Sequence, residues 1–266
     1  MRHPTPLQGR RALLLAAAAL PFLPRPAAAA EIRVMTSGGL TAAYRALSPD
    51  FEKSSSHTLH TVQGASMGAA PDAIPQRLAR GEPADVVLLA VDGLEALVAK
   101  GLAMPGSRVD IARSLIGMAV RAGAPKPDIS TVDTFRQALL AARSVAYSAS
   151  ASGVYIETEM YRRLGIHDEM MAKSRRILSE RVGTVVARGE AEIGFQQVSE
   201  LLPIQGIDYL GTIPEAVQQP TIFCAGIAAK SENPEAARAL IRFLSSPEAA
   251  PVLVRTGLEP IARAGG

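Results

Sequence analysis

Short apolar runs alternate with stretches in which apolar residues recur three and four positions apart along most of this chain. The first pattern is typical of buried β-strands, and the second of helices that pack one face on a core. Strands are predicted at residues 32–35, 58–62, 84–90, 115–121, 144–147, 192–196 and 221–229. Helices are predicted at residues 92–100, 131–142, 233–244 and 247–256, and two more begin after residues 39 and 153. This alternation indicates an α/β fold with mainly parallel sheets.

Three loops of small residues, 36–39, 64–68 and 148–153, each follow one of these strands. A strand, a small-residue turn and a helix leave backbone N–H groups and hydroxyls pointing at one spot, where the helix dipole favours an anion. We therefore expect the loops to converge on one anionic ligand, whereas the alternative is that Ser150 or Ser152 only caps a helix. The candidate ligand-binding residues in the loops are Ser37, Gly38, Gly39, Ser66, Met67, Ser148, Ser150, Ser152 and Gly153.

Residues 1–30 are predicted to be a secretory leader and not part of the fold. Arg2, Arg10 and Arg11 precede an apolar run at 12–23, and an Ala-x-Ala cleavage site occupies 28–30. The run is shorter than the ~20 apolar residues that a membrane span needs. We expect a periplasmic protein, exported either by the general route or, since two arginines are adjacent, by the twin-arginine route.

The leader changes the charge balance. Four of the 28 Lys and Arg residues lie in it, which leaves 24 basic residues against 25 acidic ones in the mature chain. No mature segment combines a basic run with aromatic residues, so we expect no nucleic-acid partner. Cys224 is the single cysteine, which excludes an intramolecular disulfide, and His57 and His60 would face opposite sides of an extended segment. We therefore predict neither a metal site nor a cofactor.

The chain is long enough for two α/β domains. Open α/β sheets bind ligands at the carboxyl ends of their strands, so one small-residue loop per domain, facing across a cleft, is the simplest arrangement. The Gly- and Pro-rich connector at 122–128 suggests a break just after Arg121.

The chain resembles the periplasmic molybdate-binding proteins and related type II solute-binding proteins of ABC importers. The resemblance is carried by residues 37–41 (Ser-Gly-Gly-Leu-Thr), 64–66 (Gly-Ala-Ser), 81–86 (Gly-Glu-Pro-Ala-Asp-Val), 189–194 (Gly-Glu-Ala-Glu-Ile-Gly) and 233–248. It implies two doubly wound α/β domains joined by two crossover strands, 115–121 and 221–229, with the ligand between the domains. Domain one would comprise 31–118 plus 222–266, and domain two 119–221. The family also implies an ABC importer in the membrane as partner.

Two positions depart from the molybdate binders. Gly39 stands where that family has a serine, and Phe195-Gln196-Gln197 stands where it has a tyrosine, so two oxyanion-binding hydroxyls are missing and Gln197 becomes a candidate ligand-binding residue. Residues 37–39, 66–68, 119–130, 146–155 and 186–197 are instead similar to a branch that includes bacterial aconitate isomerases. We therefore expect a di- or tricarboxylate ligand in preference to molybdate.

An isomerase would need two chemical functions in this site. Interconversion of cis- and trans-aconitate passes through an allylic carbanion, which requires a base and groups that stabilise carboxylates. The loops contain no Asp, Glu, His or Lys, so Tyr155 is our candidate base, with Tyr147 second, and Arg121 our candidate cation. The alternatives are that each tyrosine anchors its loop and that Arg121 is a surface residue.

The sequence thus favours an exported binding protein that captures a small anion for an ABC importer. The alternative is a cofactor-free aconitate isomerase on the same fold, and binding of molybdate or another oxyanion is the third interpretation.

Overall fold

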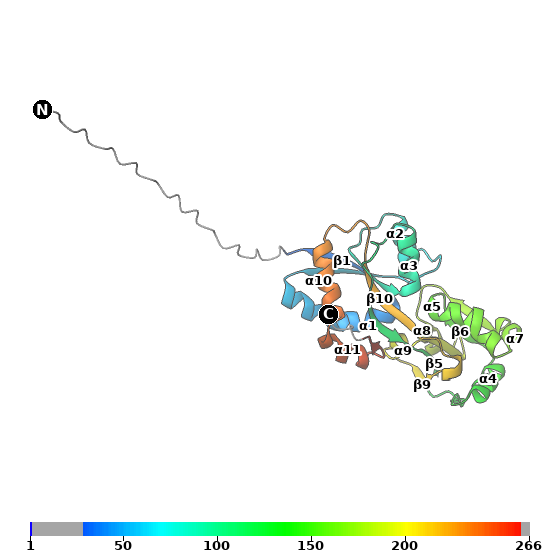
Figure 1. Cartoon of the computed structure of the whole chain (residues 1–266). Helices are drawn as coiled ribbons and strands as arrows, with labels where there is room; N and C mark the ends of the chain where they lie inside the picture. The colour runs from blue at the N-terminus through cyan, green and yellow to red at the C-terminus, as the bar shows by residue number, and fades with distance from the viewer. Residues whose placement is uncertain (2–28, 262–266) are drawn as a thin grey trace.

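A computed structural model describes residue 1 and residues 29–261 (Figure 1). The predicted leader at 1–30 lies almost entirely outside the described residues. Within the described part, no helix has both the length and the apolar character that crossing a membrane requires.

The strands form two sheets, and each sheet is the centre of one lobe (Figure 1). The first sheet has the order β11-β4-β10-β3-β1-β2 and the second β7-β6-β8-β5-β9. The strands are β1 (Glu31–Thr36), β2 (Thr58–Gln63), β3 (Val86–Ala90), β4 (Val109–Ser114), β5 (Ile116–Arg121), β6 (Val145–Ser148), β7 (Ser174–Ile177), β8 (Ile193–Gln197), β9 (Ile207–Thr212), β10 (Thr221–Ile227) and β11 (Glu259–Pro260).

The helices of the first lobe are α1 (Gly38–Ser55), α2 (Ile74–Ala79), α3 (Val91–Ala99), α10 (Pro234–Leu244) and α11 (Ala250–Arg255). Those of the second lobe are α4 (Val132–Ala141), α5 (Ala151–Tyr155), α6 (Tyr161–Arg163), α7 (His167–Met171), α8 (Val182–Ala187) and α9 (Val198–Leu201). A π-helical turn, η1 (Ile156–Met160), joins α5 to α6, and the short 3₁₀ turns are η2 (Glu215–Val217) and η3 (Pro247–Ala249).

The chain passes between the two sheets twice. It leaves the first sheet at Leu115, between β4 and β5, and returns between Thr212 at the end of β9 and Thr221 at the start of β10. Two α/β domains joined by two crossing segments, as predicted, are therefore confirmed. The exact domain boundaries at residues 118 and 222 stay a prediction.

Both sheets are mixed, which corrects the expectation of mainly parallel sheets. β1 is parallel to β2 and β3, and β6 is parallel to β7 and β8. β10 is antiparallel to β3 and β4, and β5 is antiparallel to β8 and β9. Parallel neighbours need a crossover connection within one sheet. β5 and β10 instead enter their sheets from the other lobe, so their direction is not set by a crossover helix.

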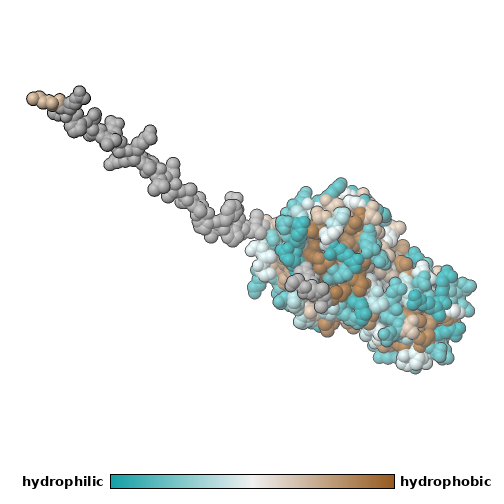
Figure 2. Space-filling model, viewed as in Figure 1, coloured by the Kyte–Doolittle hydropathy of each residue, from teal (hydrophilic) through white to brown (hydrophobic). Residues whose placement is uncertain are grey.

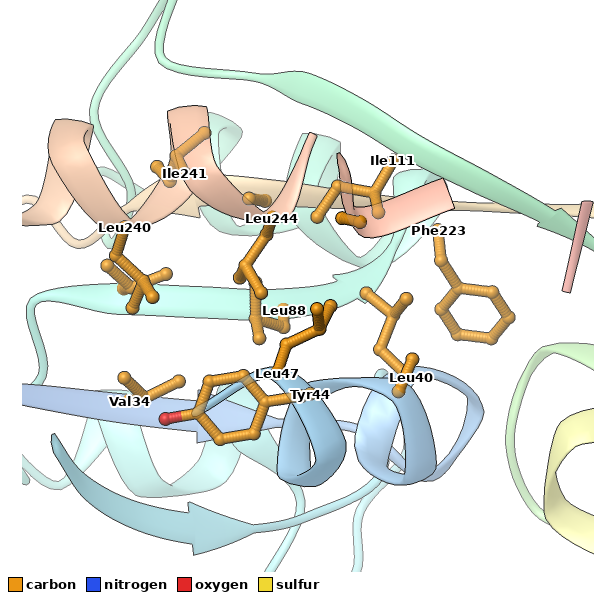
Figure 3. Packing of buried hydrophobic residues seen from close by; sticks show 14 of the residues in the cluster. Val34, Leu40, Tyr44, Leu47, Leu88, Ile111, Phe223, Leu240, Ile241 and Leu244 are labelled. Carbon is orange, nitrogen blue, oxygen red and sulfur yellow. The ribbon is translucent and has the colours of Figure 1, made fainter. Parts of the chain in front are cut away.

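The core of the first lobe fixes where α1 begins. Leu40, Tyr44 and Leu47 recur on one face of α1 and point toward Val34 of β1 and Leu88 of β3 (Figure 3). The apolar face of α10 completes this cluster, as its spacing predicted. Each such buried side chain stabilises the fold by about 1.5–3 kcal/mol. Because this packing starts at Leu40, the first small-residue loop is held at the end of β1.

A separate core supports the second lobe. Phe135 of α4, Tyr147 of β6 and Phe195 of β8 are fully buried in it, and Tyr161 packs edge-on against Tyr147. On the visible face of this lobe hydrophilic residues predominate (Figure 2). The second lobe therefore has a hydrophobic interior of its own.

Cys224 lies in β10 and is fully buried. Among the described residues, no three His, Cys, Asp or Glu side chains are grouped so that they could hold a metal ion.

Asp85 ties three segments of the first lobe together. Its carboxylate accepts hydrogen bonds from the Arg33 N–H at 2.9 Å, the Ser231 hydroxyl at 2.7 Å and the Asn233 N–H at 3.0 Å. Burial alone would raise the pKa of Asp85, but these bonds outweigh it and lower the pKa below its ordinary value. Asn233 occupies the N-cap position of α10, but its side chain makes no cap hydrogen bond and donates to the Glu31 carbonyl. The motif at 81–86 thus has a structural role at its aspartate.

We expect Asp85→Asn to lower the free energy of unfolding by about 2 kcal/mol near neutral pH, because hydrogen bonds to a charged acceptor are lost. The pKa of Asp85 is lowered by folding, so its stabilisation is present above the ordinary pKa and is lost as the pH falls through the folded-state pKa. The difference between wild type and variant should therefore shrink in acid. Urea unfolding at several pH values measures it, and a difference independent of pH would contradict this assignment.

Candidate functional site

The three small-residue loops meet at one cleft between the lobes. Its empty volume is about 770 Å³, part of which is open to solvent, and this is in the range of small-molecule sites. Among the predicted residues, Ser37, Gly38, Gly39, Ser66, Ser148, Ser150, Ser152 and Gln197 line it, whereas Met67, Gly153, Arg121 and Tyr155 do not. The expected convergence of the loops is thus present in the structure, and their binding of a ligand stays a prediction.

The first loop presents an unused hydroxyl. Ser37 occupies the N-cap position of α1, but its side chain makes no cap hydrogen bond. The Ser37 Oγ is buried and has no hydrogen-bond partner among the described residues. A buried polar atom without a partner is costly, which indicates that the hydroxyl is satisfied by something else in the cleft.

Position 39 requires a glycine because the Phe223 side chain of β10 lies against it. A Cβ atom at position 39 would overlap the Phe223 ring, which lies at one edge of the core residues labelled in Figure 3 and also lines the cleft. A serine at this position, as in the molybdate binders, therefore does not fit beside Phe223.

The second loop is held by its serine. The Ser66 hydroxyl oxygen accepts a hydrogen bond from the Ala90 N–H at 3.0 Å and is buried at the end of β3. Because this oxygen accepts from the backbone, its own hydrogen remains available for donation.

The third loop stacks serines at the end of β6. The Ser148 and Ser152 hydroxyls lie 3.3 Å apart, and both are buried. Ser150 occupies the N-cap position of α5 without a side-chain cap bond, so the simple capping alternative is not what the structure shows for it. Gly153 is not part of the lining, and a Cβ atom added at this position would overlap the Ser148 carbonyl oxygen.

A fourth segment, at the end of β8, also lines the cleft. The Gln196 Oε1 accepts from the Val182 N–H at 2.9 Å, and its Nε2 donates to the Glu200 Oε1 at 2.9 Å. The Gln197 Nε2 donates to the Thr221 hydroxyl at 2.8 Å, while its Oε1 is buried without a partner among the described residues. Gln196 thus connects the end of β8 to the start of α8 and to Glu200, and Gln197 connects it to the start of β10.

The sequence analysis missed four charged residues that line the cleft: Asp72, Glu180, Arg181 and Glu200. Arg181, at the N-cap of α8, and Glu200, in α9, are both half-buried. Burial raises the pKa of Glu200 to about 7, although the Arg181 charge and the Gln196 amide lower it. In the described part of the chain no carboxylate forms an ion pair with Arg181. The sequence signal that could have indicated Glu200 is its position four residues after Gln196, a spacing at which the two side chains are hydrogen-bonded in the structure.

Arg121 lies at the wrong end of its strand to reach the cleft. β5 runs antiparallel to β8, so Ile116 pairs with Gln197 at the cleft while Val120 pairs with Ile193. At about 3.3 Å per residue, Arg121 is roughly 16 Å further along than Ile116. It is exposed, and its guanidinium lies beside Gly189. Arg121, the cation that the sequence suggested, therefore lies outside the cleft, and the arginine that lines the cleft is Arg181.

Tyr155 is also directed away from the cleft. Its hydroxyl donates to the Val217 carbonyl at 2.8 Å, and Arg163 lies 5.6 Å from its ring centroid. Burial raises the pKa of Tyr155, although Arg163 lowers it in part. The hydroxyl of the second candidate, Tyr147, donates to the Glu157 carboxylate. Burial is the main reason that the pKa of Tyr147 is raised to about 12, and the hydrogen bond to Glu157 adds to it. Both tyrosines anchor their segments, which was the stated alternative.

The cleft therefore combines several neutral hydroxyl donors, one arginine and one carboxyl group of raised pKa. Hydroxyls and a guanidinium suit the carboxylates of a small anion, since charge-assisted hydrogen bonds are the strong ones. The carboxyl group adds a proton acceptor within the same cavity.

Known proteins resemble this chain in sequence and in fold. Residues 32–259 match the family model described as bacterial extracellular solute-binding protein. The curated protein "Aconitate isomerase" of a Pseudomonas species is 48% identical over 251 residues, which cover 93% of this chain and 96% of the relative.

Two solved structures share the fold at lower identity. The sulfate-binding protein SubI of Mycobacterium tuberculosis has a TM-score of 0.71 and 19% identity, with 88% of each chain covered. The periplasmic molybdate-binding protein of Azotobacter vinelandii has a TM-score of 0.68 and 22% identity, with 85% of this chain and 98% of that one covered. These matches confirm the predicted fold and family resemblance, and the chain belongs to the bacterial extracellular solute-binding proteins.

Proposed function

We propose that this protein is an aconitate isomerase that interconverts cis- and trans-aconitate without a cofactor. The observation that carries the proposal is the 48% identity to an aconitate isomerase over nearly the full length of both chains. The sequence favoured delivery of an anion to an importer, and this relative supports the alternative instead. We also propose that residues 1–30 direct export, in keeping with the extracellular family.

The lining of the cleft supports a carboxylate substrate. Aconitate carries three carboxylates, and the cleft offers hydroxyls from three loops together with Arg181. Phe223 excludes a serine at position 39, so one hydroxyl of the molybdate binders has no counterpart here. Carboxylates should therefore bind more tightly than molybdate.

The reaction is a proton transfer along an allylic system. A base removes a proton from the methylene carbon, the electron pair spreads over the allyl unit and its carboxylates, and a proton returns to the former vinyl carbon. Donors that face the carboxylates stabilise the carbanion, and they are most effective in a cleft that is largely closed to water. We assign this role to Ser37, Ser148 and Arg181, because all three line the cleft.

Purified protein alone should convert cis-aconitate to trans-aconitate, and dialysis against a chelator should leave the rate unchanged. Proton NMR of the reaction mixture follows both isomers directly, with heat-denatured protein as the control. Absence of conversion, together with saturable calorimetric binding of a di- or tricarboxylate, would contradict the proposal and support delivery to an importer. Tighter binding of molybdate than of every carboxylate would support the oxyanion interpretation.

A further inference from the structure

We propose that Glu200 is the general base of this cleft, taking the proton from the methylene carbon of aconitate and returning it to the other end of the allyl unit. The inference rests on the proposed isomerase function and assigns the group that the three loops do not supply.

The position of Glu200 places it between the lobes. α9 follows β8 directly, and the Glu200 carboxylate extends from the second lobe to the first turn of α1 in the first lobe. A Cβ atom added at Gly38 would overlap the Glu200 Oε1, so this glycine makes room for the carboxylate. The group therefore lies where the first loop, with its unpartnered Ser37 hydroxyl, meets the end of β8.

The surroundings of Glu200 leave one carboxylate oxygen free. The Gln196 Nε2 donates to Oε1, and no hydrogen bond within the described residues engages Oε2. The charged group that faces it is Arg181 at the N-cap of α8, while the start of α1 lines the cleft with the uncharged Ser37, Gly38 and Gly39. Burial holds the pKa of Glu200 at about 7, which suits a base that must accept and release a proton near neutral pH.

The other acids of the cleft are engaged elsewhere. Both oxygens of Glu180 accept from the Arg188 guanidinium, at 2.9 and 3.0 Å. Asp72 accepts a long, 3.5 Å hydrogen bond from Ser179 of the opposite lobe. Glu180 is exposed and paired with an arginine, whereas Asp72 is half-buried like Glu200 but contacts Ser179 across the cleft. Glu200 is the acid of the lining whose pKa is raised toward neutrality and whose Oε2 has no hydrogen bond within the described residues.

The proton and electron balance closes on this one residue. The C–H bond of the methylene breaks as the O–H bond of Glu200 forms, and the electron pair stays on the allyl unit and its carboxylates. The O–H bond then breaks as a C–H bond forms at the former vinyl carbon, which restores the Glu200 carboxylate. Nothing is oxidised or reduced, and no co-reactant is needed.

The test replaces Glu200 by glutamine, which keeps the shape of the side chain but accepts no proton. We expect kcat for cis-aconitate to fall about 10²–10⁴-fold, while the calorimetric Kd for trans-aconitate changes by less than about fivefold. In the wild type, kcat should rise as the pH rises through about 7, because only the ionised carboxylate removes a proton, and this rise should be absent in the residual activity of Glu200→Gln. Glu190→Gln, outside the cleft lining, is the matched control and should keep the wild-type kcat.

The outcomes separate this proposal from the proposed function. An active wild type with an equally active Glu200→Gln would overturn the role of Glu200 and leave the isomerase standing, as would a loss of kcat in Asp72→Asn instead. An inactive wild type would overturn both. If Glu200→Gln does not fold, as judged by its thermal unfolding, Glu200→Asp and the wild-type pH profile decide, and a flat profile overturns the proposal.

Discussion

Gly153→Ala should lower the free energy of unfolding by about 3 kcal/mol, the upper end of the usual cost of overpacking, because the atoms it meets have no room to move. The Cβ atom would overlap the carbonyl oxygen of Ser148, which belongs to the backbone at the end of β6 and is fixed by its sheet neighbours. Either α5 or the end of β6 must shift, and the serines of the third loop shift with them. Urea unfolding measures the loss.

A glycine with open space around it separates this effect from backbone strain. Gly106 has a φ of 73° and nothing within 4 Å of an added Cβ atom, so Gly106→Ala should cost only about 1 kcal/mol. Equal losses in the two variants would contradict the steric argument for Gly153.

The fold could be predicted where the signal is local. α1 and α10 were found because their apolar residues recur at helical spacing over three or more turns, and that same face is buried in the structure. β4, β7, β9 and β11 escaped prediction. Of these, β7 reads Ser-Arg-Arg-Ile and β9 is half-buried along most of its length, so neither has a clear apolar run. The direction of β5 and β10 depends on where the chain passes from one lobe to the other, and the local sequence pattern contains no information about that.

The same division holds for the candidate site. The three loops were found because strand, small-residue turn and helix are adjacent in sequence, and the structure places all three at the cleft. Arg121 and Tyr155 were misplaced because strand register and the contact with Val217 decide which way each side chain points. Glu200 and Arg181 are distant in sequence from the loops. Glu200 reaches the cleft because α9 packs against α1 of the first lobe, and Arg181 lines it from the N-cap of α8.

Arg181→Gln should raise KM for cis-aconitate about 100-fold, because a carboxylate loses a charge-assisted hydrogen bond that the amide replaces only weakly. Arg181 also lowers the pKa of Glu200, so its removal should move the pH dependence of kcat to higher pH. Steady-state kinetics between about pH 6 and 9 measures both changes, and the calorimetric Kd for trans-aconitate gives the binding loss independently of turnover.

The matched control is the arginine that the sequence had favoured. Arg121 is exposed at the far end of β5, so Arg121→Gln should leave KM within about twofold of wild type. Arg181→Lys keeps the charge but loses the planar fork that pairs with two carboxylate oxygens, and it should fall between wild type and Arg181→Gln. A larger effect at Arg121 than at Arg181 would mean that the substrate binds outside the cleft that the three loops form. The two arginines thus test the position of the site, while Glu200 tests its chemistry.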